Sequence, residues 1–216
     1  MGGKGTMENE ILSGHGEAAW QRCAAFHGHV CPGLALGYAA TRLAMARLRE
    51  DSRAEDEELV AVVENDACFV DAVQVLTGCT FGKGNFFHKD YGKIALTLFS
   101  RRSGRGVRVS LKGDILAQNP EHAHLLKKVM SGQADAAERA RFEELHAQRT
   151  REILEADPEH LFQATFVEAP VPERARMEPS APCRRCGEPT MPSKMVSGPL
   201  GLICRGCAES AASAQD

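Results

Sequence analysis

The residues best suited to chemistry lie in the first half of the chain, where histidine and cysteine alternate in a short segment. His27 and His29 are two positions apart, and Cys31 follows two positions later. On a helix these side chains would splay over different faces, but in an extended or looped segment alternate residues share a side. All three could then face one metal ion, for which imidazole and thiolate are suitable ligands. The segment therefore predicts a metal or reactive-thiol site.

A second cysteine is placed like the first, close to the start of a helix. Cys31 comes directly before Pro32, a residue suited to the first turn of a helix, and Cys68 lies near the start of the next predicted helix. The positive end of a helix dipole favours the thiolate form of a nearby cysteine. Asp71 is three residues after Cys68 and so lies on the same helical face. These residues are candidates for catalysis as well as for metal binding.

The loop after this helix adds further candidates. Cys79 follows a glycine turn, Lys83 and Asn85 lie in the Gly-rich loop beyond it, and Gln74 lies on the helix before it. A metal ion with one open position could polarise a carbonyl or activate water. Asp71 could then orient a ligand or act as a base, and Lys83 could stabilise an anion. The alternative is a set of structural thiols, as we expect for Cys23 in its helix of apolar residues.

The other four cysteines form a separate motif near the end of the chain. Their spacing is C-x2-C-x17-C-x2-C, which predicts a structural zinc site. Two redox-active C-x2-C pairs are the alternative. The second pair runs into a helical segment, which favours a treble-clef-like finger over a plain ribbon. The segment is too small to bury a core, so the metal must supply its folding energy. The four residues are Cys183, Cys186, Cys204 and Cys207.

The elements that must position these residues predict an α+β fold with a mixed sheet flanked by helices, plus the small finger. We expect a core domain over residues 1–168, a Pro-rich linker over 169–182 and the finger over 183–216; residues 1 to about 13 look like a loose polar tail. Helices are expected at 17–26, from Pro32 onward, at 67–76, from Asn119-Pro120 onward and at 135–155, with strands at 59–64, 93–100, 107–111 and 161–167.

Composition excludes several classes of protein. The net charge of -3 gives no basic field for nucleic acid, and no apolar run has the length of a membrane span. No secretory signal is visible, so we expect a cytoplasmic protein whose cysteines stay reduced or metal-bound. Walker, Rossmann and G-x-S-x-G motifs are absent from the sequence. The remaining histidines, among them His122, His124 and His146, are expected to be surface residues.

Two blocks of sequence resemble one known family. The run Phe26-His27-Gly28-His29-Val30-Cys31-Pro32-Gly33 and the block from Asn65-Asp66-Ala67-Cys68 to Gly82-Lys83-Gly84-Asn85 are similar to the signatures of the FmdE family, named after a component of formylmethanofuran dehydrogenase. The resemblance implies a dimeric α+β core with an appended treble-clef finger. It also implies a metal or active site formed from His27, His29, Cys31, Cys68 and Cys79, with Asp71, Gln74 and Lys83 around it.

Three functions fit these expectations. The first is a metal-binding accessory protein, or a maturation or cofactor-handling factor, of the molybdenum or tungsten enzyme that the family accompanies in methanogens, with molybdopterin oxidoreductase subunits as partners. The second is a metal-dependent enzyme in its own right, and the third is a scaffold whose finger docks a partner. For the core metal, histidine and cysteine ligands suit zinc or iron. Which ligands bind at once stays open.

Overall fold

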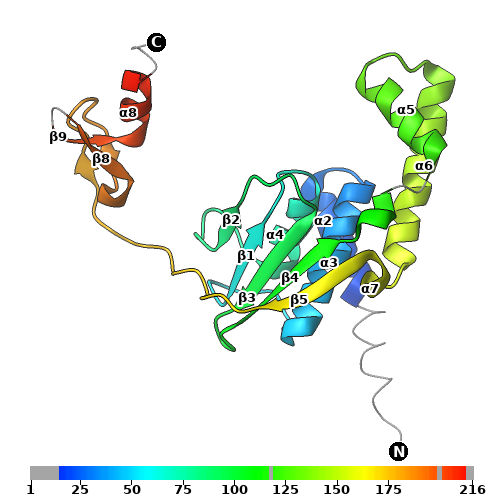
Figure 1. Ribbon diagram of the computed structural model, residues 1–216, viewed down its shortest axis with the longest axis horizontal. Coiled ribbons are helices and arrows are strands. Elements are labelled where there is room, and N and C mark those ends of the chain that lie inside the picture. Colours follow the sequence, from blue (N-terminus) through cyan, green and yellow to red (C-terminus); the bar gives the residue numbers. More distant parts are fainter. Residues whose placement is uncertain (1–14, 117–118, 199–200, 213–216) are drawn as a thin grey trace, which may run out of the picture. The chain divides into compact units, whose positions relative to one another are not determined.

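A computed structural model describes residues 15–116, 119–198 and 201–212, so the expected N-terminal tail lies outside the described residues. The chain divides into two compact units, Met1–Arg174 and Ala175–Asp216 (Figure 1). The division falls inside the segment expected to be a linker. Arg101 donates hydrogen bonds to the carbonyl oxygens of Pro172 and Glu173, which ties the start of that segment to the first unit. Its last two residues pair with a strand of the second unit.

A five-stranded mixed sheet forms the centre of the first unit, in the order β2-β1-β3-β4-β5. Only the β1–β2 pair is parallel, and the other three pairs are antiparallel. All five side chains of β1 are buried, as its β-branched sequence predicts. The strands are β1 (Leu59–Val63), β2 (Phe86–His88), β3 (Ala95–Ser100), β4 (Arg105–Leu111) and β5 (Phe162–Val167).

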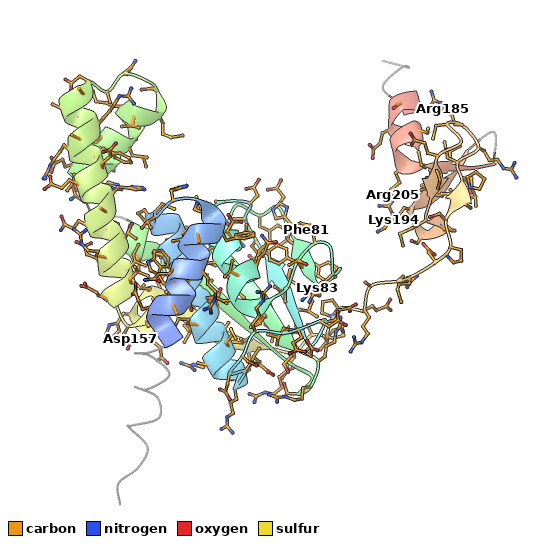
Figure 2. The ribbon with its side chains drawn as sticks, turned by 180° about the vertical axis from the view of Figure 1, so that it is seen from behind. Phe81, Lys83, Asp157, Arg185, Lys194 and Arg205 are labelled. Atoms are coloured by element: carbon orange, nitrogen blue, oxygen red, sulfur yellow. The ribbon has the colours of Figure 1, made fainter. Side chains whose placement is uncertain are left out.

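Helices cover one face of this sheet. Figure 2, which shows the molecule from behind, places α2 in front of the strands. The apolar residues of α3 pack on β1, β3 and β4 to form the main core, and α3 also packs against α4 and α6. The helices are α2 (His15–His27), α3 (Pro32–Leu48), α4 (Phe69–Thr77), α5 (Pro120–Met130), α6 (Ala136–Glu155) and α7 (Pro158–Leu161), with a 3-10 turn, η1 (Gly113–Leu116). The expected α+β fold with a mixed sheet is confirmed.

The contact between α3 and α4 depends on one glycine. A Cβ atom at Gly37 would overlap the backbone of Phe69, including its carbonyl oxygen. Alanine would gain about 1 kcal/mol of helix propensity at this position. Because backbone atoms cannot rotate away, the overlap outweighs that gain, and we expect Gly37→Ala to lower the free energy of unfolding by about 2 kcal/mol or more. Urea denaturation measures the effect. Gly82→Ala is the control, since a Cβ at Gly82 meets no atom within 4 Å; equal losses in both variants would contradict the packing argument.

The second unit contains two short hairpins and a helix. Strands β6 (Ala181–Pro182) and β7 (Pro189–Thr190) pair, as do β8 (Met195–Gly198) and β9 (Gly201–Cys204). A 3-10 turn, η2 (Pro192–Lys194), precedes β8, and helix α8 (Arg205–Ala212) follows β9 without a gap. The order of cysteine knuckle, hairpin and helix is the one that a treble-clef-like finger requires.

Candidate metal centres

Four of the predicted core ligands come together between the ends of three helices. His27 is the last residue of α2, Cys31 is the N-cap of α3, and Cys68 is the N-cap of α4. One ligand atom from each of these residues and from His29 lies within 4.8 Å of all the others. Ligand atoms around a tetrahedral zinc ion lie about 3.3–3.8 Å apart. A small inward movement of the side chains would therefore let the group hold one metal ion.

The local backbone explains why these side chains meet. Gly28 has φ +89°, a left-handed conformation that ends α2 directly after His27. The chain then runs without helix until α3 begins, so His29 returns to the side of His27. The two imidazole rings lie 4.3 Å apart between centroids. This is the looped geometry that the alternating spacing predicts.

His27 is oriented by a carboxylate behind it. Its Nδ1 atom donates to Asp71 Oδ2 at 2.6 Å, and the Nε2 atom on the other side of the ring lies 3.8 Å from Cys31 Sγ. Gln74 Nε2 donates to the second oxygen of Asp71 at 3.5 Å. A histidine whose far nitrogen is bonded to a carboxylate is the usual arrangement at protein metal sites, because the carboxylate fixes the ring and its tautomer.

Cys31 lies deeper than the two histidines. Its side chain is 5% exposed, and its sulfur accepts a hydrogen bond from the backbone N–H of Leu34 at 3.4 Å. Burial raises the pKa of the Cys31 thiol, and the Leu34 N–H opposes that shift. A divalent cation beside the sulfur would favour the thiolate and offset the cost of burial. The environment of Cys31 thus suits a metal ligand better than a free nucleophile.

Three of the candidates lie at the other end of α4. Cys79 follows the helix, is fully buried in the main core, and has its pKa raised to about 11 by that burial. Lys83 donates to the carbonyl oxygens of Glu55 and Gly78, and the buried Asn85 donates to backbone carbonyl oxygens. The 9 residues of α4 span about 13 Å. The structure therefore places these three apart from the group at Cys68.

A contact that the sequence did not indicate joins α5 to α6. His122 Nε2 lies 3.0 Å from His146 Nδ1, although we expected both to be surface residues. The two residues are 24 positions apart on different helices. Their approach depends on how the helices pack, so no local pattern in the sequence signals it.

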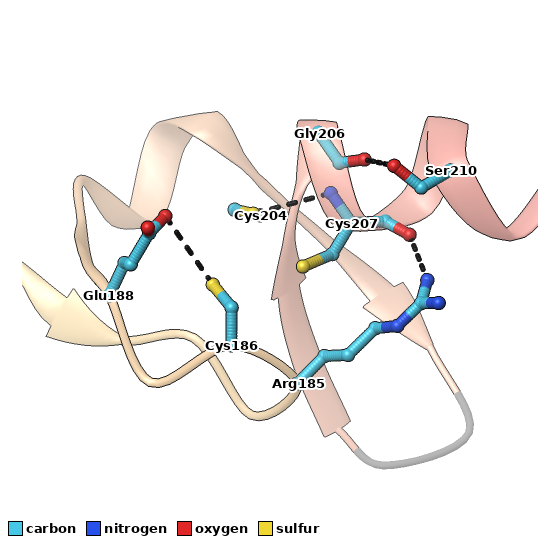
Figure 3. A pocket seen from close by; sticks show the side chains of 7 residues that line it. All are labelled: Arg185, Cys186, Glu188, Cys204, Gly206, Cys207 and Ser210. Carbon is cyan, nitrogen blue, oxygen red and sulfur yellow. Dashed lines mark hydrogen bonds between the residues drawn. The ribbon is translucent and has the colours of Figure 1, made fainter.

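The four tail cysteines form the second group of ligands. Their sulfur atoms lie within 4.8 Å of one another, and Figure 3 shows the sulfurs of Cys186, Cys204 and Cys207 around one hollow. Backbone N–H groups of Cys186 and Cys204 lower the pKa of the Cys183 thiol to about 6. A hydrogen bond with Cys204 raises the pKa of Cys207 to about 12. Four such thiols cannot all ionise side by side without a cation, so the donor set fits a divalent metal such as zinc.

Comparison with known proteins identifies the family. The sequence profile of the FmdE family, described as "FmdE, Molybdenum formylmethanofuran dehydrogenase operon", matches residues 26–163. This range includes all of the core ligand group. The chain belongs to the FmdE family, which confirms the resemblance seen in its two sequence blocks.

Two relatives extend the comparison. The crystal structure of an FmdE-like protein of the tungsten formylmethanofuran dehydrogenase from Syntrophus aciditrophicus is similar, with a TM-score of 0.60 and 26% identity over 90% of this chain and 92% of that one. A probable S-adenosyl-L-methionine-binding protein from Archaeoglobus fulgidus is 37% identical over 191 residues, which is 86% of this chain and 52% of the relative. The chain spans about half the length of that relative. Among the helices of the described ranges, none is long and apolar enough to cross a membrane.

Proposed function

We propose that this protein is a metal-binding accessory or maturation factor for a molybdenum or tungsten enzyme of the formylmethanofuran dehydrogenase type. The observation that carries the proposal is the group of His27, His29, Cys31 and Cys68, whose ligand atoms lie within 4.8 Å of one another. Membership of the FmdE family and the similarity to the FmdE-like protein of known structure supply the link to the enzyme. Two nitrogens and two sulfurs suit zinc or iron(II).

The position of the group suggests what the ion does. Cys31 is buried, whereas His29 is exposed to solvent, and the neighbouring Phe26 and Val30 are 60% and 52% exposed. A structural ion is normally enclosed by its four ligands, while a functional one keeps a position open. We propose that His27, Cys31 and Cys68 hold the ion and that His29, on the open side, can give way to a ligand from solution. Such a site can receive, hold or pass on a metal or a metal-bound cofactor.

Exogenous ligands test whether a position is open. Cobalt(II) would be loaded into a Cys183→Ser/Cys186→Ser variant, so that the visible bands report on the core site alone. We expect azide or a small thiol to shift those bands in a saturable way, and His29→Ala to bind the added ligand more tightly. A cobalt spectrum that no added ligand changes would show a closed structural ion and overturn the proposal in favour of a scaffold.

The carboxylate behind His27 provides a separate test of a metal role. Asp71→Asn keeps the size of the side chain but removes the charge that fixes the His27 tautomer. Loss of such a carboxylate costs metal affinity, and we expect a decrease of about 10-fold to 100-fold in competition with a chromophoric chelator. Asp66→Asn is the matched control, because Asp66 is exposed and its side chain lies outside the ligand group. Equal affinities of the Asp71 and Asp66 variants would contradict the orienting role.

One comparison favours a second candidate, an enzyme or binding protein for S-adenosylmethionine. It rests on the Archaeoglobus fulgidus relative, whose name includes that ligand. About half of that relative lies outside the match, and this chain has no G-x-G-x-x-G motif to bind a nucleotide. We therefore rank this candidate second. Calorimetric titration with S-adenosylmethionine decides between them: a saturable signal that is lost with Cys31→Ser would place the ligand at the core site and promote the second candidate.

A further inference from the structure

The histidine pair on α5 and α6 lies outside both cysteine-containing groups. His122 Nε2 and His146 Nδ1 are 3.0 Å apart. Phe142, one turn before His146 on α6, stacks on the His122 ring with an interplanar angle of 4° and a centroid distance of 5.3 Å. Both imidazoles are half-buried, whereas His124 on the same helix is exposed. The packing of the two helices thus holds two imidazole nitrogens at a fixed separation.

This separation is also that of two ligands on one metal ion. At Zn–N distances of about 2.0–2.1 Å, two imidazole nitrogens at roughly tetrahedral or right angles lie about 3.0–3.3 Å apart. Without a metal, one nitrogen must donate a proton to the other. If each ring carries its proton on the outer nitrogen, both inner lone pairs can bind the same ion. The pair therefore needs a change of tautomer, and no movement of a helix, to become a chelating site.

The surroundings keep the two rings neutral, which a metal ligand requires. Burial lowers the pKa of His122 and of His146; the charge of Arg149 lowers the first further, and those of His122 and His29 lower the second. The guanidinium of Arg149 is held by the carbonyl oxygen of Ile115 and by Glu152, so its charge is partly compensated. These positive neighbours also oppose a bound cation, so the pair should bind metal more weakly than the thiolate-containing groups.

We propose that His122 and His146 form a third metal site, which takes a divalent transition-metal ion of the zinc, nickel or copper class. The remaining positions on the ion would be filled by water or by an anionic ligand from solution. The site joins α5 to α6 independently of the core group, so it goes beyond the proposed function and does not rest on it. The influence of His29 on His146 places the two sites in the same region of the first unit.

Zinc titration of the full chain tests this site. The protein would first be saturated at its tighter sites and then titrated with zinc by calorimetry, with bound zinc counted by elemental analysis. We expect the parent to bind about three ions per chain and His122→Gln about two, since glutamine keeps a polar contact with His146 but is a poor zinc ligand. His124→Ala, on the same helix, should match the parent.

Further variants keep the outcome decisive. Cys31→Ser should lose the core ion but keep the zinc-dependent rise in thermal unfolding temperature that His122→Gln lacks, which separates this site from the core site. If His122→Gln is poorly folded, His146→Asn replaces it, and circular dichroism of the zinc-free proteins checks the fold. Equal zinc content in the parent and in a folded pair variant would overturn the proposal, as would loss of the same ion in His124→Ala.

Discussion

Cys31→Ser is expected to remove the core metal ion and leave the fold unchanged. Serine is a good N-cap, so its oxygen can accept the Leu34 N–H that Cys31 accepts now, and α3 should begin at the same residue. An oxygen ligand is much poorer than a thiolate for a borderline metal such as zinc. We expect bound metal to fall by about one ion per chain, while the metal-free variant unfolds within about 0.5 kcal/mol of the metal-free parent. Elemental analysis and urea denaturation measure the two quantities.

Cys79→Ala is the control for this experiment. Cys79 is also a buried cysteine, but it lies at the other end of α4 and outside the ligand group. The alanine variant should lose some stability, about 1 kcal/mol, because it leaves a small cavity. It should keep all of its metal. Retention of metal by Cys31→Ser, or its loss in Cys79→Ala, would show that the core ligands are assigned wrongly.

Cys204→Ser is expected to unfold the second unit and spare the first. The sulfur of Cys204 accepts the N–H of Cys207, and its own N–H donates to Cys183, so Cys204 connects both pairs of cysteines. The unit has only short strands and one helix, and metal binding on the order of 10 kcal/mol is what folds such a module. Limited proteolysis should cut the variant rapidly within residues 183–212 and leave a stable fragment of the first unit.

Ser197→Ala provides the comparison, since Ser197 is exposed on β8 and lies outside the ligand group. It should resist protease as the parent does. Removal of metal from the parent with a chelator should reproduce the Cys204→Ser cleavage pattern. If the Cys204 variant and the parent are cut alike, the four cysteines do not hold a structural metal, and the alternative of two redox pairs gains support.

Local patterns in the sequence were sufficient where the chemistry is local. The alternation of His27, His29 and Cys31 around a glycine predicted a looped segment with its ligands on one side, and the structure has that segment. Helix-start signals placed Cys31 and Cys68 at N-caps. The β-branched runs located four of the five sheet strands. Each of these features depends on residues within a few positions of one another.

Features that depend on tertiary packing were not visible in the same way. Strand β2 has only three residues inside a polar, Gly-rich segment that we expected to be a loop, and it forms because β1 offers it a parallel edge. Cys79 was grouped with Cys68 because the two are close in sequence, but α4 lies between them. The pairing of His27 with Asp71 joins residues 44 positions apart. The homodimer, the molybdopterin partner, the cytoplasmic location and the identity of both metals stay predictions.

The metal content of freshly purified protein tests the central claim most directly. Elemental mass spectrometry would be applied to the parent and to the Cys183→Ser/Cys186→Ser variant, after dialysis that removes weakly bound ions. We predict about two tightly bound ions per chain in the parent and about one in the variant, the remaining ion being the one held by His27, Cys31 and Cys68. One ion in the parent and none in the variant would contradict a metal site in the core.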